Sequence, residues 1–223
     1  FNVNDGEIIA NLVDEENNKN KEEGSLIFSC GDVITNDTIL DGNLLNCPGD
    51  GLVIGASDIT LDCNDHIIIG DDSGEDSGVY INATFDNITI KNCFVAAFFY
   101  GIYHPYAPDY GYTHNWAIAN NNINSNYYGI YLEGVTDSNI TENYVHSNDN
   151  DGIYMSRPSW NIFLDNTVNS NTGAGTQFSS GIHLVYGSRN KLIGNTVNSN
   201  INPNPELGAF GISIFDSLDD VLE

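Results

Sequence analysis

The sequence predicts an all-β solenoid of about seven short parallel rungs with loop insertions, and two repeated phrases are the evidence. A glycine-led phrase, in which Ile or Val, usually Tyr, and another apolar residue follow the glycine, starts at Gly78, Gly101, Gly129, Gly152, Gly181 and Gly211. A second phrase, ending in Ser-Asn, starts at Asn121, Asn143, Asn166 and Asn195. Repetition at a short period is typical of a solenoid. Apolar–polar alternation within each phrase favours β-strands over helices.

Each rung is expected to begin at its glycine and to turn at its asparagine. In the rung at Gly129, Ile130 and Leu132 should point into the core and Tyr131 outward. Gly and Asn suit tight corners because both tolerate positive φ. Asparagines at 92, 143, 166 and 195 are expected to stack as a ladder of side-chain amides.

The spacing of the glycine phrases varies, which predicts insertions between rungs. These insertions occupy residues 70–77, 104–114, 172–179 and 201–209, and insertions in a repeat protein form loops. Residues 1–24 lack the repeat and are interpreted as a strand followed by an acidic linker, whereas residues 25–223 form the solenoid. The apolar segment Ile8–Val13 either caps the first rung or pairs with the edge of a neighbouring molecule.

The net charge of −25, with six Lys and Arg residues, excludes nucleic acid as a partner, because phosphate neutralisation needs a basic surface. Polyanionic substrates are disfavoured unless a cation bridges the charges. No stretch of 18 apolar residues occurs, so no membrane span is expected.

Several features predict export to the cell surface or the extracellular space, with a signal peptide removed. The only methionine is Met155 and the chain starts at Phe1, so either a signal peptide has been removed or the sequence is part of a longer chain. Four sequons for N-glycosylation start at Asn36, Asn82, Asn87 and Asn139.

The four cysteines point the same way, since an even count in an exported chain favours disulfides. A bridge between Cys30 and Cys47 is expected across the opening rung. Cys63 and Cys93 either pair or remain buried thiols. No CxxC spacing occurs, which excludes a zinc knuckle.

The repeats resemble those of right-handed parallel β-helix proteins, the NosD-like and carbohydrate-binding and sugar-hydrolysing groups. The opening segment, from Cys30-Gly-Asp-Val-Ile to Leu52-Val-Ile-Gly-Ala-Ser-Asp-Ile-Thr-Leu-Asp-Cys, resembles the first rungs of secreted prokaryotic surface proteins of this kind. The resemblance implies a right-handed parallel β-helix. It says little about activity, because such folds include pectin lyases, polygalacturonases, epimerases, tailspikes, adhesins and surface-layer proteins.

The main candidate site is a column of outward aromatic side chains two positions after each glycine. Its members are Tyr80, Tyr103, Tyr131, Tyr154 and His183, with Trp160 as a further candidate. Sugar rings can lie on such a surface. The alternatives are a stacking ladder that stabilises the sheet and an interface with another protein.

Oxygen-rich loops are weaker candidates for a calcium site, and otherwise no cofactor is expected. The carboxylates concerned are Asp71, Asp72, Asp76, Asp149 and Asp151. They match no calcium-binding motif, and a solvated acidic surface is the competing interpretation. The loop His104–His114, which contains Asp109, forms either a binding lip or an aromatic plug.

Catalysis is not expected, because the motif blocks of polygalacturonases are absent and few cationic residues are available for a lyase. The leading hypothesis is therefore a non-enzymatic structural protein of the cell surface that associates with itself, end to end or through its N-terminal strand, into a filament or array. The alternative is a protein that binds or cleaves polysaccharide on the Tyr80–His183 face, as a lyase or glycoside hydrolase in the cleaving case.

Overall fold

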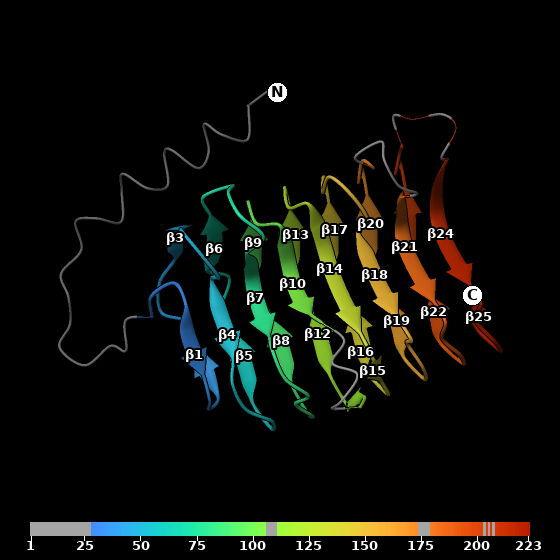
Figure 1. Cartoon of the computed structure of the whole chain (residues 1–223). Coiled ribbons are helices and arrows are strands. Elements are labelled where there is room, and N and C mark those ends of the chain that lie inside the picture. Colours follow the sequence, from blue (N-terminus) through green and yellow to red (C-terminus); the bar gives the residue numbers. More distant parts are fainter. Residues whose placement is uncertain (1–27, 106–110, 174–178, 203, 205, 207) are drawn as a thin grey trace.

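The computed structural model describes residues 28–105, 111–173, 179–202, 204, 206 and 208–223. These residues form a parallel β-solenoid whose strands advance along one axis from β1 to β25 (Figure 1). The predicted all-β fold is confirmed, and the described residues contain no helix. The predicted N-terminal strand and linker, residues 1–24, lie outside the described residues.

Three parallel sheets form the faces of the solenoid. Sheet A contains β1 (Asp32–Ile34), β4 (Leu52–Ile54), β7 (Ser77–Ile81), β10 (Tyr100–His104), β14 (Tyr128–Glu133), β18 (Ile153–Ser156), β21 (Ser179–Val185) and β24 (Ala209–Phe215). Sheet B contains β2 (Thr38–Ile39), β5 (Thr60–Asp62), β8 (Thr89–Lys91), β12 (Ala117–Ala119), β16 (Asn139–Thr141), β19 (Ile162–Leu164), β22 (Lys191–Ile193) and β25 (Val221–Leu222). Sheet C contains β3 (Leu44–Cys47), β6 (Ile67–Gly70), β9 (Phe94–Ala96), β13 (Asn122–Asn124), β17 (Tyr144–His146), β20 (Thr167–Asn169) and β23 (Thr196–Asn198).

One strand from each sheet makes a turn of the solenoid. Sheets A and B have eight strands and sheet C has seven, so the described residues form seven three-strand turns and a two-strand partial turn. A short pair, β11 (Thr113–His114) and β15 (Val135–Thr136), lies beside the main sheets. The three sheets continue in parallel across all four predicted insertions, and β11 lies within the insertion at residues 104–114.

The core is a stack of aliphatic residues, one layer per turn. On β14, Ile130 and Leu132 are fully buried while Tyr131 faces outward, as the alternation predicted. Ile102, Ile153 and their equivalents continue the same columns in neighbouring turns. Alternate residues of every strand therefore build one continuous interior.

The repeated glycines are required for space, which corrects the expectation that they provide positive φ. A Cβ added to Gly152 would lie 2.8 Å from the carbonyl oxygen of Gly181 and 2.7 Å from Nδ2 of Asn171. Neither Gly152 nor Gly181 has a positive φ. Any larger residue would push adjacent turns apart at this column.

Three ladders of buried and half-buried side chains run along the corners of the solenoid, where one was predicted. The ladder between sheets B and C contains Asn121, Asn143, Asn166 and Asn195. The ladder between sheets C and A contains Asn126, Asn148, Asn171 and Asn200. The ladder between sheets A and B contains Asn161, Asn190 and Asp220, with Ser138 preceding them.

Asn143 shows how a ladder amide between two other asparagines uses its full hydrogen-bonding capacity. Nδ2 of Asn143 donates to the carbonyl oxygen of Ile118 at 2.8 Å and to Oδ1 of Asn166 at 3.0 Å. Oδ1 of Asn143 accepts from the backbone N–H and from Nδ2 of Asn121. Because an amide has two donor hydrogens and two acceptor lone pairs, this buried side chain is fully satisfied.

The residue before each ladder position has a positive φ and turns the chain through the corner. Glu142 (φ 55°) precedes Asn143, and Ser147 (φ 54°) precedes Asn148. The left-handed residue thus directs the next side chain inward, where the ladder holds it.

The predicted ladder was wrong at its first member, because Asn92 lies one residue before the ladder position. Asn92 has a φ of 55° and bonds to the part-buried Asp62 and the exposed Asn120. The next residue, Cys93, lies in the ladder column, and its N–H donates to Oδ1 of Asn121 at 3.0 Å.

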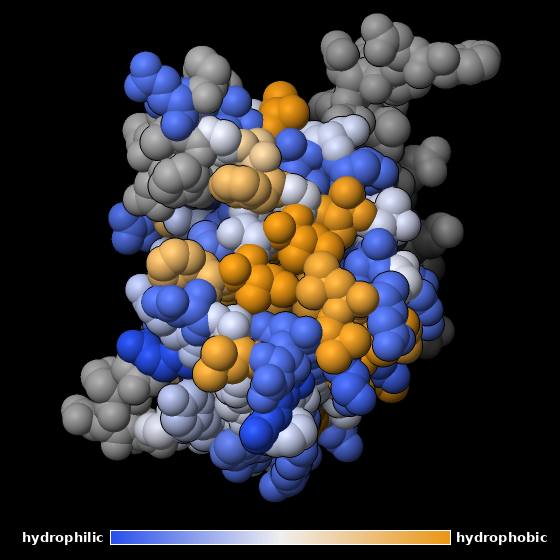
Figure 2. Space-filling view, turned by 90° about the vertical axis from the view of Figure 1, so that its right-hand side faces the viewer, coloured by the Kyte–Doolittle hydropathy of each residue, from blue (hydrophilic) through white to orange (hydrophobic). Residues whose placement is uncertain are grey.

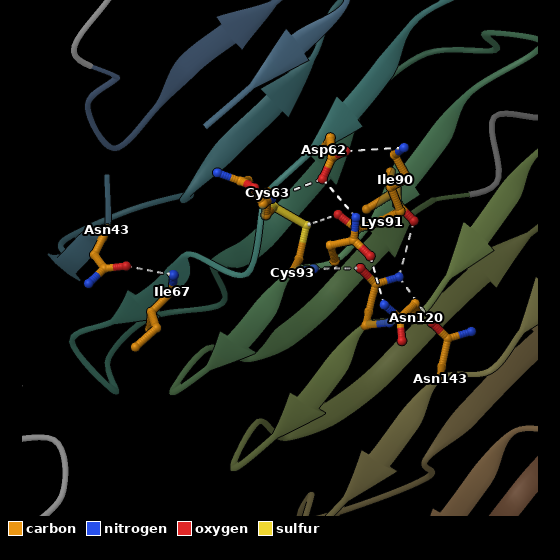
Figure 3. Close-up of a disulfide and its surroundings, with 12 residues drawn as sticks. Asn43, Asp62, Cys63, Ile67, Ile90, Lys91, Cys93, Asn120 and Asn143 are labelled. Atoms are coloured by element: carbon orange, nitrogen blue, oxygen red, sulfur yellow. Dashed lines mark hydrogen bonds and ion pairs between the residues drawn. A yellow bond between two sulfur atoms is a disulfide. The ribbon is translucent and has the colours of Figure 1, made fainter. Parts of the chain in front are cut away.

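A disulfide continues this column toward the N-terminal end. Cys63 and Cys93 are bonded, with their Cα atoms 4.7 Å apart, and both are buried (Figure 3). Of the two alternatives that the sequence left open, the structure has the disulfide, and the two residues occupy adjacent turns, since the N–H of Cys63 bonds to the carbonyl oxygen of Lys91. The second disulfide joins Cys30 to Cys47 across the first turn.

Candidate functional site

The outward aromatic residues form one column along sheet A. Tyr80, Tyr103, Tyr131, Tyr154 and His183 pair in register from β7 to β21. All five are half-buried. The column therefore presents one ring per turn on a single face of the solenoid.

A second aromatic column lies beside the first, and the sequence analysis missed it. Tyr100 and Tyr128 stand directly before the repeated glycines, and they pair in register on β10 and β14. Tyr100 stacks on Tyr103 of the first column, with ring centroids 4.0 Å apart and an interplanar angle of 8°. Phe99 and Tyr127 stack beside them at 4.5 Å. The signal in the sequence was the aromatic pair that precedes Gly101 and Gly129.

The tyrosines of the two columns form one surface, the tyrosine face, which consists of Tyr80, Tyr100, Tyr103, Tyr128, Tyr131 and Tyr154. Its rings adopt two orientations. Tyr80, Tyr103, Tyr100 and Tyr128 are close to parallel, with interplanar angles of 8° to 12° between successive rings. Tyr131 is turned by 66° relative to Tyr103 and by 70° relative to Tyr128.

Tyr131 in turn stacks on Tyr154, with ring centroids 4.5 Å apart and an interplanar angle of 23°. The near-parallel stack therefore does not include Tyr131, which forms a second stacked pair with Tyr154.

Carboxylates lie beside the rings at this change of orientation. The hydroxyl of Tyr131 donates to Oε1 of Glu133 at 3.0 Å. On the next turns, the buried Asp151 lies 3.2 Å from Nδ1 of His183 and also accepts the backbone N–H of Ser180. An Nδ1–H that donates to Asp151 leaves Nε2 of His183 as an acceptor.

The pKa shifts of the tyrosine hydroxyls reflect burial and these neighbouring charges. Burial, together with the adjacent rings and Glu133, raises the pKa of Tyr103 to about 12. Burial is also the main cause of the raised pKa of Tyr131 and of Tyr154, and Glu133 adds to both. These hydroxyls stay protonated at neutral pH, so they are hydrogen-bond donors.

Trp160 lies apart from the tyrosine face, at the corner between β18 and β19. Its φ is 61° and its side chain is exposed. The guanidinium carbon of Arg189 lies 4.7 Å from the centre of the indole ring. The residue thus makes a cation–π contact with the following turn.

The calcium candidates do not converge on a site. Burial raises the pKa of Asp149, and the nearby charge of Asp72 adds to the effect. Asp71 accepts hydrogen bonds from Ser73 within its own loop. In the part of the chain that the structure describes, no three His, Cys, Asp or Glu side chains are grouped as a metal would require. Asp76 belongs to the same loop as Asp71, and Asp151 is bonded to His183.

The two histidines of the 104–114 loop point to different surroundings. His104 is buried, with Nδ1 2.9 Å from the carbonyl oxygen of Ile81 and its ring against Trp116. His114 is on the surface beside Thr136 and Asp137. The loop's Asp109 lies outside the described residues.

The four sequon asparagines are exposed, but their surroundings differ. Asn82 lies in the loop after β7, and Asn139 projects from β16. The side chain of Asn36 donates to Thr35, and that of Asn87 donates to Asp58 at 2.6 Å.

The described residues contain no helix long and apolar enough to cross a membrane.

Comparison with solved structures gives distant similarities only. The chain is similar to the A-module of a mannuronan C-5 epimerase from Azotobacter vinelandii, with 14% identity and a TM-score of 0.40, over 87% of this chain and 56% of that module. It is also similar to the DFA-IIIase of Arthrobacter chlorophenolicus A6, with 15% identity and a TM-score of 0.37, over 90% of this chain and 66% of the enzyme. The chain thus spans little more than half of the epimerase module. Comparison with curated proteins found no match.

Comparison with protein families is decisive for the fold. The family described as the right handed beta helix region matches residues 26–197 and 109–222. These ranges cover most of the chain and coincide with the stacked turns of the three sheets. The chain therefore belongs to the right-handed β-helix family.

Proposed function

We propose that this protein is an exported carbohydrate-binding protein, and that the tyrosine face of sheet A holds a polysaccharide chain. The observation that carries the proposal is the group formed by Tyr131, Tyr154 and His183 with Glu133 and Asp151 beside them. A bare contact surface needs only apolar rings. A sugar site needs rings together with hydrogen-bonding groups that fix the hydroxyls.

The change of ring orientation at Tyr131 supports a sugar-binding role. Rings that stack face to face cover one another, so they offer little free face to a ligand. Tyr131 is rotated by 66° relative to Tyr103 and stacks on Tyr154 instead, so a sugar ring would pack on a face of this pair that the partner ring leaves uncovered. The apolar C–H face of a sugar can pack on a free aromatic face, while the tyrosine hydroxyls, Glu133 and Nε2 of His183 supply donors and acceptors for its hydroxyls.

The charges favour a neutral polysaccharide. No Lys or Arg stands on any strand of sheet A, whereas Glu133 and Asp151 lie next to the rings. A uronate chain would meet repulsion on this face without a bridging cation.

The proposed activity is binding without cleavage. Hydrolysis of a glycosidic bond requires a pair of carboxyl groups that are free to act on the bond and on water. Here Glu133 accepts a hydrogen bond from the hydroxyl of Tyr131, and Asp151 is bonded to the backbone N–H of Ser180 and to His183. We therefore do not assign these carboxylates to hydrolysis.

The proposed location outside the cytoplasm is supported by the cysteines. All four form disulfides, Cys30 with Cys47 and Cys63 with Cys93. Such bonds persist mainly in oxidising compartments. Export by a removed signal peptide and glycosylation at the sequons belong to the same proposal.

A binding screen against neutral, amino and uronate polysaccharides tests the function. We expect a neutral polysaccharide to bind, and Tyr131→Ala and Tyr154→Ala each to weaken binding by about tenfold or more. Tyr144→Ala is the matched control, because Tyr144 is 41% exposed on sheet C, away from the tyrosine face. Unchanged binding in both tyrosine-face variants, with the fold intact by circular dichroism, would rule out this face as the site.

A further inference from the structure

The corner between sheets A and B carries an unexpected set of residues in the sixth and seventh turns, which start at β18 and β21. One position of this corner has a positive φ in every turn from the second to the eighth. The backbone hydrogen bonds between turns align the residues at this position, which are Asp58, Asn87, Asn115, Asp137, Trp160, Arg189 and Asp219. Asp and Asn tolerate a left-handed backbone, whereas bulky side chains adopt it rarely. Trp160 and Arg189 are thus the two exceptions in the column.

A second position of the same corner, three residues earlier, shows the same exception. Its residues in the fifth to eighth turns are Gly134, Arg157, Tyr186 and Asp216, all with a positive φ. Large side chains therefore occupy both left-handed positions in the sixth and seventh turns, where the flanking turns have Gly or Asp. Backbone strain that persists at the surface points to a function.

The four residues Arg157, Trp160, Tyr186 and Arg189 form a two-by-two array, which we call the corner patch. A cation and an aromatic ring alternate along each turn and also from one turn to the next. Trp160 and Tyr186 are 55% and 58% exposed. The corners of the fifth and eighth turns, residues 134–137 and 216–219, flank the patch, so its exposure does not arise at an end of the solenoid.

Apolar side chains also project from sheet B beside the corner patch, in the same two turns. Ile162 and Leu164 on β19 and Ile193 on β22 lie on the outer face and are half-buried. In the preceding turn, β16 presents Asn139 and Thr141 instead. Figure 2, which looks onto the solenoid from the side of its last strands, shows mostly hydrophilic residues around the apolar interior. Exposed Trp, Tyr and Arg beside aliphatic side chains have the composition of a protein contact surface.

Cations are concentrated at the corner patch and beside it. Arg157, Arg189 and Lys191 are three of the six Lys and Arg residues of a chain whose net charge is −25. Two copies of such a chain repel each other over most of their surface, and these cations reduce the repulsion locally. A polyanion would fit poorly, because exposed aspartates stand on either side of the patch.

We propose that the corner patch pairs with the corner patch of a second copy of this chain, side by side about a two-fold axis. An axis across the solenoid places Arg157 opposite the partner's Tyr186, and Trp160 opposite the partner's Arg189. An axis along the solenoid places Arg157 opposite the partner's Trp160, and Tyr186 opposite the partner's Arg189. In both cases each guanidinium meets an aromatic ring and no guanidinium meets another, so the patch is complementary to itself. Such a contact closes at two copies.

The aspartates that flank the corner patch give this pairing a distinctive salt dependence. Asp137 precedes the patch, and Asp216 and Asp219 follow it, all of them exposed. In the pair these carboxylates approach those of the partner and repel them. Salt screens exposed charges, so association should strengthen as the ionic strength rises, whereas a contact held by ion pairs would weaken.

Sedimentation velocity of the 223-residue chain at increasing concentrations tests the proposal. We expect the 24.3 kDa chain to form a reversible dimer, favoured at about 1 M salt relative to about 0.1 M. Trp160→Asp should lower the association constant by about tenfold or more, because it removes a ring that faces a guanidinium. It should not lower the melting temperature, since Asp is the residue at this position in the fifth and eighth turns. Tyr144→Asp, at an exposed tyrosine of sheet C, adds the same charge and should leave association unchanged.

Tyr186→Arg separates the pairing of rings with cations from a general effect of charge. It lowers the net negative charge of the chain, which by itself would favour association, but it places guanidinium opposite guanidinium for either axis. We expect association to weaken by about tenfold or more. A chain that stays monomeric under all conditions overturns the proposal. So does a dimer that weakens as salt rises, a dimer that Tyr186→Arg strengthens, or an equal loss in Trp160→Asp and Tyr144→Asp. None of these results bears on sugar binding at sheet A.

Discussion

Asn190 donates from Nδ2 to Oδ1 of Asp220 at 3.0 Å, while Oδ2 of Asp220 is buried without a hydrogen-bond partner. In the preceding turns the equivalent atom is the amide nitrogen of Asn161 or Asn190. That nitrogen donates to the carbonyl oxygen of Val135 or of Pro158. At Asp220 the corner ladder thus has an oxygen at a position where Asn161 and Asn190 have a donor.

Asp220→Asn is therefore expected to stabilise the protein by about 1 kcal/mol, because the new amide can donate as Asn161 and Asn190 do. Urea-induced unfolding measures the change. Asp219→Asn is the control, since Asp219 is exposed and its contact with Arg189 at 3.7 Å is a surface ion pair of little energetic value. Equal stabilisation by both variants would point to charge reduction instead.

Asn143→Ala is expected to destabilise the protein by roughly 2–4 kcal/mol. It removes four hydrogen bonds and takes away the acceptor of the buried backbone N–H of Asn121. Asn198→Ala, on the exposed surface of sheet C, should change stability by less than about 0.5 kcal/mol. The ladder would be energetically unimportant if the two variants unfolded at the same denaturant concentration.

Gly152→Ala is expected to lower the free energy of unfolding by about 2 kcal/mol or more, because its Cβ would press on the backbone of the next turn. Gly42→Ala offers a direct comparison, since a Cβ at Gly42 meets no atom within 4 Å. Thermal unfolding of the two variants gives the difference. A tolerant Gly152 would mean that the turns can separate at little cost.

The stability of the protein should fall as the pH decreases below about 6.5, and His104 should account for part of the fall. Burial lowers the pKa of His104. Between the folded and the unfolded pKa, the unfolded chain therefore binds a proton at this residue that the folded chain does not bind. The stabilisation is complete above the unfolded pKa and is lost as the pH falls toward the folded pKa.

The free energy of unfolding of His104→Gln should therefore depend less on pH in this window than that of the unmodified chain. Denaturant titrations at several pH values measure both slopes. Identical slopes would show that His104 titrates normally in the folded protein.

Alkaline titration should divide the tyrosines into two groups. Burial raises the pKa of the six tyrosine-face residues, Tyr80, Tyr100, Tyr103, Tyr128, Tyr131 and Tyr154. Tyrosinate absorbance should thus show a group that ionises above the usual tyrosine range, in which Tyr103 ionises at about pH 12. A single transition near pH 10 for all twelve tyrosines would mean that the face is open to water.

The repeated phrases predicted the fold because each turn repeats the same local alternation. They could not predict alignments that depend on the lengths of the insertions. The insertion at residues 70–77 obscured the pairing of Cys63 with Cys93, and a one-residue offset placed Cys93 rather than Asn92 in the ladder. Tyr100 was missed for a related reason, because it precedes its glycine and joins the face only through register with Tyr128.

The second repeated phrase contains the residues of two of the three corner ladders, but the sequence analysis recognised only the ladder at the start of the phrase. The Ser-Asn at the end of each second phrase supplies a positive-φ residue and then a ladder amide, as Ser147 and Asn148 do. The orientation of the rings, such as the rotation of Tyr131, depends on packing between turns. It therefore cannot be predicted from the sequence of one strand.

The corner ladders also make the turn a modular unit. Successive ladder residues such as Asn143 and Asn166 are 23 residues apart, and each amide makes the same bonds whichever turn it belongs to. A turn removed between two equivalent corners would leave every remaining donor opposite an acceptor. Such a protein can gain or lose length by whole turns, through duplication or deletion of one segment, without redesign of its interior.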